Sequence, residues 1–204
     1  MNGIAVYMKG GGDSREGKAR LRQGMSEFLR SLRESAGHKR LSWKIVACGS
    51  RNEAHGAFLH ATMTAPEIFN VLLVDSEGPA AQSPRARLQQ HDGWALTGIG
   101  EDRIHLMIQV MEAWIVSDAE SMARYYGQHF LRNALPRSRS LEGVEKERIY
   151  EALKRATAKT KKGAYHKISR AAALLEIIDP PVVRRRCPAC DRLFAKLTDA
   201  IGAA

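Results

Sequence analysis

The sequence predicts an α/β protein built on a parallel sheet, and three observations carry the prediction. Short apolar segments alternate with longer segments in which apolar residues recur at helical spacing. Residues 69–74 are almost entirely apolar, as is typical of a strand buried on both faces. The resulting strand–helix–strand–helix–strand order implies right-handed crossovers between parallel strands.

Each element of the first half follows from local signals. The strand that begins at Ile4 ends before Gly10-Gly11-Gly12, and apolar residues between Leu21 and Leu32 mark one face of a helix. Gly49-Ser50 ends the second strand, and Pro66 stops the second helix. We expect strand 4–8, helix 14–36, strand 43–48, helix 52–64 and strand 69–74.

The second half begins with a turn-rich break over 79–84 and becomes helical toward its end. Apolar residues alternate with others over 104–110, which favours a fourth strand, although a helix from Met107 onward stays open. We expect helices over 118–126 and from 141 to the C-terminus, with interruptions at Gly163 and at Asp179-Pro180-Pro181.

The composition is that of a globular protein. The chain has 204 residues, 44% hydrophobic and 26% charged, which excludes the disordered and fibrous classes. We divide it into an α/β core, 1–130, and a helical C-terminal extension packed on that core, 131–204. No apolar run is long enough to span a bilayer, and the start lacks a signal-peptide pattern. With only three cysteines, a soluble cytoplasmic protein without a membrane partner is expected.

The charge of the chain indicates a polyanionic partner. The net charge is +10 and the pI is about 9.8, and nucleic acid is the commonest polyanion in a cytosol. Residues 15–44 carry 9 Lys/Arg against 3 Glu, residues 137–170 carry 11 against 4, and residues 101–122 are acidic. Basic flanks around an acidic middle suit a metal-dependent enzyme that acts on phosphates, and ordinary solvated helix faces explain them equally well.

The glycine-rich segment after the first strand is the first candidate site. Three glycines let the backbone approach a ligand and a helix N-terminus favours anions, although Asp13 or Ser14 serves equally as a helix N-cap. Residues 12–18 also match the G-x-x-x-x-G-K pattern of a phosphate-binding P-loop. Position 19 is Ala, so the hydroxyl that holds Mg²⁺ in such loops is missing, which counts against a nucleotide hydrolase.

The acids at the end of the third strand are the second candidate. Ligand sites in open α/β sheets lie at the carboxyl ends of strands, and two acids spaced by one residue can reach one hard cation. We therefore predict that Asp75 and Glu77 bind a metal and that Glu112 completes the carboxylate cluster, with surface acids or a helix cap as the alternative. For Asp118 we expect a helix N-cap, and for His105 a satisfied core or surface histidine and not a ligand.

Two further patterns carry more than one interpretation. Lysines interleaved with Tyr165 and His166 suit phosphate contacts and base stacking, as does Arg51 after the second strand, but a solvated basic face is equally economical. Cys187 and Cys190 supply only half of a zinc site, with Cys48 the one other cysteine in the chain. A redox-active C-x-x-C motif normally begins a helix in a thioredoxin-like unit, and the C-terminal segment does not resemble one. We therefore expect Cys187 and Cys190 to be structural or incidental.

Several of these motifs, taken in order, resemble one family. They are the strand–GGGD–helix start, Gly49-Ser50-Arg51-Asn52, Val74-Asp75-Ser76-Glu77, His105-Leu106-Met107 with Met111-Glu112-Ala113-Trp114 and Asp118, and Lys162-Gly163 with Tyr165 and Lys167. From about residue 4 to 197 the chain resembles an uncharacterised bacterial family with a Toprim-like (topoisomerase–primase) fold, known chiefly as a domain of unknown function. Genes of that family often lie beside ABC-type ATPase genes, an arrangement similar to ATPase–Toprim systems of phage defence.

The resemblance implies a Mg²⁺- or Mn²⁺-dependent nuclease that acts on DNA or RNA. In such a site an acidic pair holds the metal, and a Glu at the end of the first strand acts as acid/base or as a further ligand. The implied partners are nucleic acid and an ABC-type ATPase, and a homodimer is left open. We assign catalytic roles to Asp75, Glu77, Glu112 and Lys9, metal ligation to Asp75, Glu77 and Asp13, and nucleic-acid contacts to Arg51, Lys162, Lys167 and Arg15.

One departure from the family pattern bears on the chemistry, because this chain has Lys9 where family members usually carry Glu. At an effective dielectric of about 20 and roughly 5 Å, an ammonium group repels a divalent metal by on the order of 6–7 kcal/mol. Three outcomes follow: a dead site kept for binding nucleic acid or a partner protein, a Lys9 that clamps phosphate in place of a metal, or a metal held by Glu16, Glu112 and Asp13.

Overall fold

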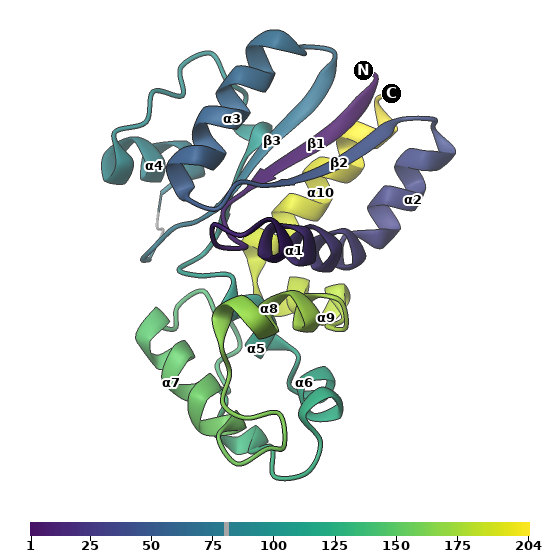
Figure 1. The fold of residues 1–204 in the computed structure, drawn as a ribbon. Coiled ribbons are helices and arrows are strands. Elements are labelled where there is room, and N and C mark those ends of the chain that lie inside the picture. The colour runs from purple at the N-terminus through teal and green to yellow at the C-terminus, as the bar shows by residue number, and fades with distance from the viewer. Residues whose placement is uncertain (80–81) are drawn as a thin grey trace.

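A four-stranded parallel sheet forms the centre of the computed structural model, which describes residues 1–79 and 82–204 (Figure 1). The strands lie in the order β2-β1-β3-β4. The turn expected over 79–84 includes residues 80 and 81, which lie outside the described residues. The strands are β1 (Gly3–Met8), β2 (Ser42–Ala47), β3 (Ile68–Asp75) and β4 (Ile104–Met107).

Helices cover both faces of the sheet, so the predicted α/β class is confirmed, and the architecture is consistent with a Toprim-like core. Side chains alternate across β3, and each set packs in a different cluster: Val71 and Leu73 with α1 and α10, Leu72 and Val74 with α3 and α4. The helices are α1 (Arg15–Phe28), α2 (Arg30–His38), α3 (Arg51–Thr64), α4 (Pro84–Asp92), α5 (Glu112–Ser117), α6 (Ala119–Tyr126), α7 (Lys146–Thr157), α8 (Lys167–Leu175), α9 (Pro180–Arg186) and α10 (Pro188–Gly202).

Helices α5 to α9 gather beyond the carboxyl ends of the strands, and α10 returns to the sheet (Figure 1). Helix α8 packs against α1 at Gly24, where a Cβ would lie 2.4 Å from the carbonyl oxygen of Ala172. One hydrophobic cluster extends from Ile4 in β1 to Ile201 in α10. The division at residue 130 stays a prediction.

Several element boundaries differ from the expectation. The helical part expected from residue 141 begins at Lys146 and has a further break at Cys187. The helix expected over 14–36 is two helices, because the chain bends at Leu29 between α1 and α2. The strand expected over 104–110 ends at Met107, because Gln109 adopts the left-handed region with φ 58° and turns the chain into α5. Within the described residues, no helix is long and apolar enough to cross a membrane.

Candidate functional site

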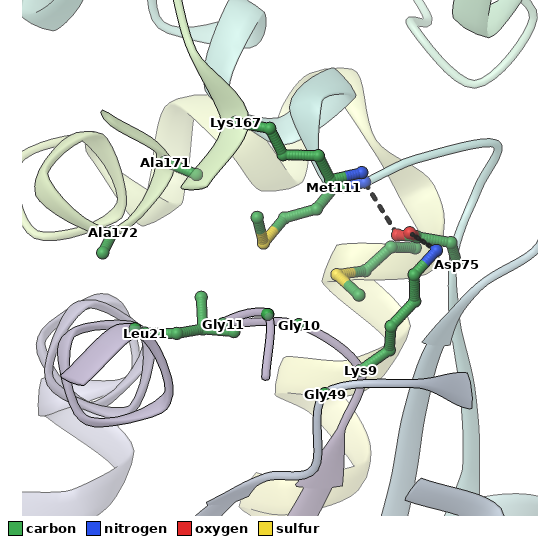
Figure 2. Close-up of a pocket in the computed structure, with 13 residues that line it drawn as sticks. Lys9, Gly10, Gly11, Leu21, Gly49, Asp75, Met111, Lys167, Ala171 and Ala172 are labelled. Carbon is green, nitrogen blue, oxygen red and sulfur yellow. Dashed lines mark hydrogen bonds and ion pairs between the residues drawn. The ribbon is translucent and has the colours of Figure 1, made fainter. Parts of the chain in front are cut away.

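The candidate site lies where the strand order reverses. The chain leaves β1 for the edge strand β2 and then returns to β3 on the other side of β1, which makes the carboxyl ends of β1 and β3 a topological switch point. Lys9 follows β1, and Asp75 is the last residue of β3. Beside them is a cavity of about 230 Å³, here called the Lys9 cavity, whose lining includes Gly10, Lys9, Asp75, Met111 and Lys167 (Figure 2).

The Lys9 ammonium group lies between the two acids predicted as metal ligands. Its Nζ is 3.0 Å from Oδ2 of Asp75 and 2.5 Å from Oε1 of Glu77. The other oxygen of Asp75 accepts a 2.9 Å hydrogen bond from the backbone N–H of Met111, and the other oxygen of Glu77 lies 3.4 Å from Nζ of Lys146. A lysine therefore occupies the position where a cation shared by Asp75 and Glu77 would lie.

The loops after β3 and β4 hold this arrangement in place. Glu77 is a non-glycine residue in the left-handed region, with φ 56°, and its N–H donates to the carbonyl of Gln109 at 3.0 Å. Ser76 Oγ accepts a 2.7 Å hydrogen bond from the N–H of Gln109, and Gln109 Oε1 accepts one of 3.1 Å from the N–H of Lys146. The strained backbone of Glu77 is thus over-determined by its neighbours, a pattern found at functional sites.

The pKa values of Lys9 and Glu77 are shifted by the ion pairs that these residues form. Burial alone would lower the pKa of Lys9, but the charge of Asp75 and the hydrogen bonds to both carboxylates outweigh burial and raise it. Burial would raise the pKa of Glu77, but its bonds to Lys9 and Lys146 lower it. Lys9 is therefore charged at neutral pH, and its ammonium group is not removed by deprotonation.

A second polar cluster surrounds Glu112, whose side chain is fully buried. Its carboxylate accepts hydrogen bonds from Tyr165 Oη at 3.0 Å and Tyr150 Oη at 3.4 Å, and Lys167 Nζ lies 3.5 Å away. Burial raises the pKa of Glu112, and the negative charge of Asp75 raises it further. The positive charge of Lys167 lowers it but does not outweigh burial. Burial and the charge of Glu112 raise the pKa of Tyr150 to about 12, so the cluster contains neutral phenols that donate to a carboxylate.

The side chains as they are held do not fit a divalent metal. Asp13 is exposed and precedes Ser14, whose Oγ caps α1 by accepting from the N–H of Gly17 at 3.0 Å. Across residues 1–79 and 82–204, no three acidic, histidine or cysteine side chains gather in a way that could hold a metal ion. The Asp75–Glu77 pair, the best candidate, has an ammonium group between its oxygens.

The four residues predicted to contact nucleic acid fall in different surroundings. Arg51 makes its contacts inside the protein. Its guanidinium group donates hydrogen bonds to the carbonyl of Asp75 and to the carboxylate of Asp92, and only 12% of the side chain is exposed. Arg15 is exposed at the start of α1. Lys162 is exposed, with its Nζ 4.8 Å from the ring centre of Tyr125. Lys167 lines the Lys9 cavity, so it alone of the four reaches both surface and site.

The G-x-x-x-x-G-K pattern does not form a phosphate-wrapping loop. Helix α1 begins at Arg15, inside the pattern, so Gly17 and Lys18 belong to its first turns. Gly17 permits close packing, since a Cβ there would lie 2.1 Å from the carbonyl oxygen of Gly11. These glycines fit the loop onto the helix, a role that the sequence pattern does not distinguish from phosphate binding.

Several remaining predictions concern capping, core and thiol residues. Asp118 caps α6 by accepting from the N–H of Ser121 at 3.0 Å, and buried His105 lies 2.9 Å from the carbonyl of Asp102, both as expected. Cys187 and Cys190 lie at the start of a helix, α10, which packs on a parallel sheet within the same hydrophobic cluster. Burial raises the pKa of both thiols, so thiolate is scarce and the structural interpretation is favoured.

Lys146 and Tyr150 complete the two polar clusters and were not predicted from the sequence. They lie four residues apart on α7, so their side chains share one face of the helix. That spacing was visible in the sequence, but nothing local indicated that this face meets the carboxyl edge of the sheet.

Comparison with known proteins gives a family match and nothing finer. The sequence model of a family described as a domain of unknown function (DUF4276) matches residues 10–198. No curated protein and no solved structure matches the chain.

Proposed function

The chain belongs to the family described as a domain of unknown function (DUF4276), and from that premise we propose that it is a nuclease-derived, Toprim-like module that binds nucleic acid without a divalent metal. One observation carries the proposal: Lys9 Nζ lies 3.0 Å from Asp75 and 2.5 Å from Glu77, in the place of a shared cation. Lys9 and Lys146, whose Nζ lies 3.4 Å from Glu77, together balance the two charges of the acidic pair, which would otherwise repel phosphate. The net charge of +10 supports a polyanionic ligand.

The binding surface we propose joins the Lys9 cavity to exposed cations around it. Lys167 lines the cavity, while Arg15 and Lys162 are exposed. Cations of this kind contact backbone phosphates and release counterions, which supplies affinity without sequence information. Arg51 contributes from the inside, by holding the end of β3 through the Asp75 carbonyl.

The first experiment measures binding of single- and double-stranded DNA and RNA in EDTA by fluorescence anisotropy. We expect binding that survives EDTA and weakens steeply between about 50 and 200 mM salt. Lys162→Ala should lower the slope of log affinity against log salt by about 1, as removal of one phosphate contact does. Lys39→Ala, an exposed lysine after α2, is the matched control. Failure of every nucleic acid to bind, with or without metal, would reject the proposal.

A second proposal is a Mg²⁺- or Mn²⁺-dependent nuclease, working with an ABC-type ATPase in phage defence. It is favoured by one observation: Lys9 bridges Asp75 and Glu77, and the charge of Asp75 reaches buried Glu112, although as they are held the three acids do not form a metal-binding group. It requires the Lys9 side chain, 23% exposed, to leave the acids. Cleavage that needs metal and is lost in Asp75→Ala would establish it, and equal degradation by wild type and Asp75→Ala would end it.

A further inference from the structure

The Lys9 cavity has one charged wall and one apolar wall. Lys9, Asp75 and Lys167 lie along one side, while Leu21, Ala171 and Ala172 lie on the opposite side (Figure 2). Met111 lines the space between them. Methionine side chains are flexible and polarizable, so they adapt to flat or irregular ligands. A ligand that fits both walls has a polar end and an apolar face.

Both lysines on the charged wall keep hydrogen-bonding capacity for such a ligand. An ammonium group has three N–H donors. Lys9 Nζ contacts Asp75 and Glu77, and Lys167 Nζ contacts Glu112 and donates to Tyr150 at 3.0 Å. Each lysine therefore has one N–H left. The acids on this wall are paired with lysines, so they do not repel an anion as free carboxylates would.

The size of the cavity limits what can enter. A water molecule takes about 30 Å³ of liquid volume, so about 230 Å³ holds roughly eight water-sized groups. That is the scale of one nucleobase, and neither a base pair nor a helix fits. A base enters such a cavity only when it is unpaired, at a strand end or extruded from its stack.

We propose that the Lys9 cavity receives the base of one unpaired nucleotide, with the base against Leu21, Ala171 and Met111 and the sugar and phosphate outside the enclosed volume, the phosphate toward the partly exposed Lys9 and Lys167. This inference rests on the proposed nucleic-acid binding and specifies its unit. Three ligands present such a nucleotide: a free nucleoside monophosphate, the end of a strand, and a base extruded from a duplex. Apolar burial of the base is independent of its sequence, so the module prefers unpaired over paired strands without reading a sequence.

The test compares two Ala→Leu variants that differ only in where the added bulk points. Ala171→Leu fills the apolar wall, while Ala19→Leu adds the same group on the exposed side of α1. Affinities are measured in EDTA for a 5′-phosphorylated single strand, its 5′-hydroxyl form, a blunt duplex and a duplex with one mismatch. AMP is titrated both directly and as a competitor of the strands.

We expect Ala171→Leu to weaken single-strand binding by about tenfold or more, the scale of losing one buried base, and Ala19→Leu to bind like wild type. AMP should displace the strands. Preference for the 5′-phosphate identifies a strand end as the source, and preference for the mismatched duplex identifies an extruded base. Either preference, or AMP binding alone, supports the proposal when it is lost in Ala171→Leu.

The opposite result separates this inference from the function on which it rests. If folded Ala171→Leu binds every strand as wild type does and AMP displaces none, nucleic acid binds outside the cavity, and only the inference fails. If no strand and no nucleotide binds, both fail. Should Ala171→Leu not fold, Lys167→Met replaces it, because loss of the ammonium group should abolish displacement by AMP. Unchanged displacement in that variant overturns the inference.

Discussion

At the scale of single residues, position 9 decides which chemistry the site can perform. The sequence shows a lysine there, but only the structure shows that its ammonium group reaches both Asp75 and Glu77. A shorter side chain at position 9, or a lysine that pointed elsewhere, would leave the two carboxylates free for a metal. The ion pairs are formed between the ends of two neighbouring strands, so their geometry follows from the strand order and not from any local pattern.

Glu112 gives a prediction about pH at the same scale. Burial raises the pKa of Glu112 in the folded state, so the folded protein holds this proton more tightly than the unfolded chain. The stability from this proton is present below the unfolded-state pKa and is lost as pH rises through the folded pKa. Wild type should therefore lose stability relative to Glu112→Gln as pH rises from about 4 to neutral.

The measurement is urea unfolding of both proteins across that pH range. Exposed Glu151→Gln on α7 is the matched control and should track wild type at every pH. A free-energy difference between wild type and Glu112→Gln that does not change with pH, or that changes in the other direction, contradicts the assignment.

At the scale of elements, glycines on two helices should respond to alanine with opposite signs. In α1, a Cβ on Gly17 would lie 2.1 Å from the carbonyl oxygen of Gly11, so Gly17→Ala must displace the loop and should cost about 1–3 kcal/mol. In α3, a Cβ on Gly56 meets nothing within 4 Å, so Gly56→Ala should stabilise by about 0.5–1 kcal/mol. Chemical denaturation of both variants checks the signs, and equal effects would refute the packing argument.

The elements that the sequence predicted have clear local signals. The strands β1, β2 and β3 contain short apolar runs, α1 has apolar residues at helical spacing, and α3 was placed by the Gly49-Ser50 break before it and Pro66 after it. Helix α4 was missed because it is polar apart from buried Leu88. Helix α5 was expected only as the open alternative of a helix from Met107 onward, because all of its residues are buried and it has no polar face to set a period.

At the scale of the whole molecule, one aromatic cluster links the sheet side to the C-terminal helices. The ring of Phe28 in α1 stacks on Trp114 of α5, with centroids 5.4 Å apart, and meets Phe194 of α10 edge-on at 5.7 Å. We expect Trp114→Ala to lower the free energy of unfolding by about 3–5 kcal/mol. Because the cluster is shared, near-UV and far-UV circular dichroism should still show a single transition. Two separated transitions in wild type would contradict a shared core, and Trp43→Ala on the edge strand is the milder control.

The candidate site was predictable only in part, for a reason that belongs to this scale. Ligand sites of α/β sheets lie at the carboxyl ends of strands, so Asp75 and Glu77 could be placed at the correct edge from the sequence alone. The partners from α7 and α8 could not, because no local signal says which helix covers that edge. Nor could the sequence show that the Arg51 guanidinium contacts the Asp75 carbonyl and Asp92 inside the protein.

The central claim is that Lys9 holds the place of a metal, and calorimetry with Mg²⁺ and Mn²⁺ tests it most directly. Wild type and Lys9→Met, which removes the charge without adding a carboxylate, are compared with Lys9→Glu. We expect no metal binding by wild type at millimolar Mg²⁺, and clear binding by Lys9→Glu together with a Tm that metal raises. Metal binding by wild type that is lost in Asp75→Ala would contradict it.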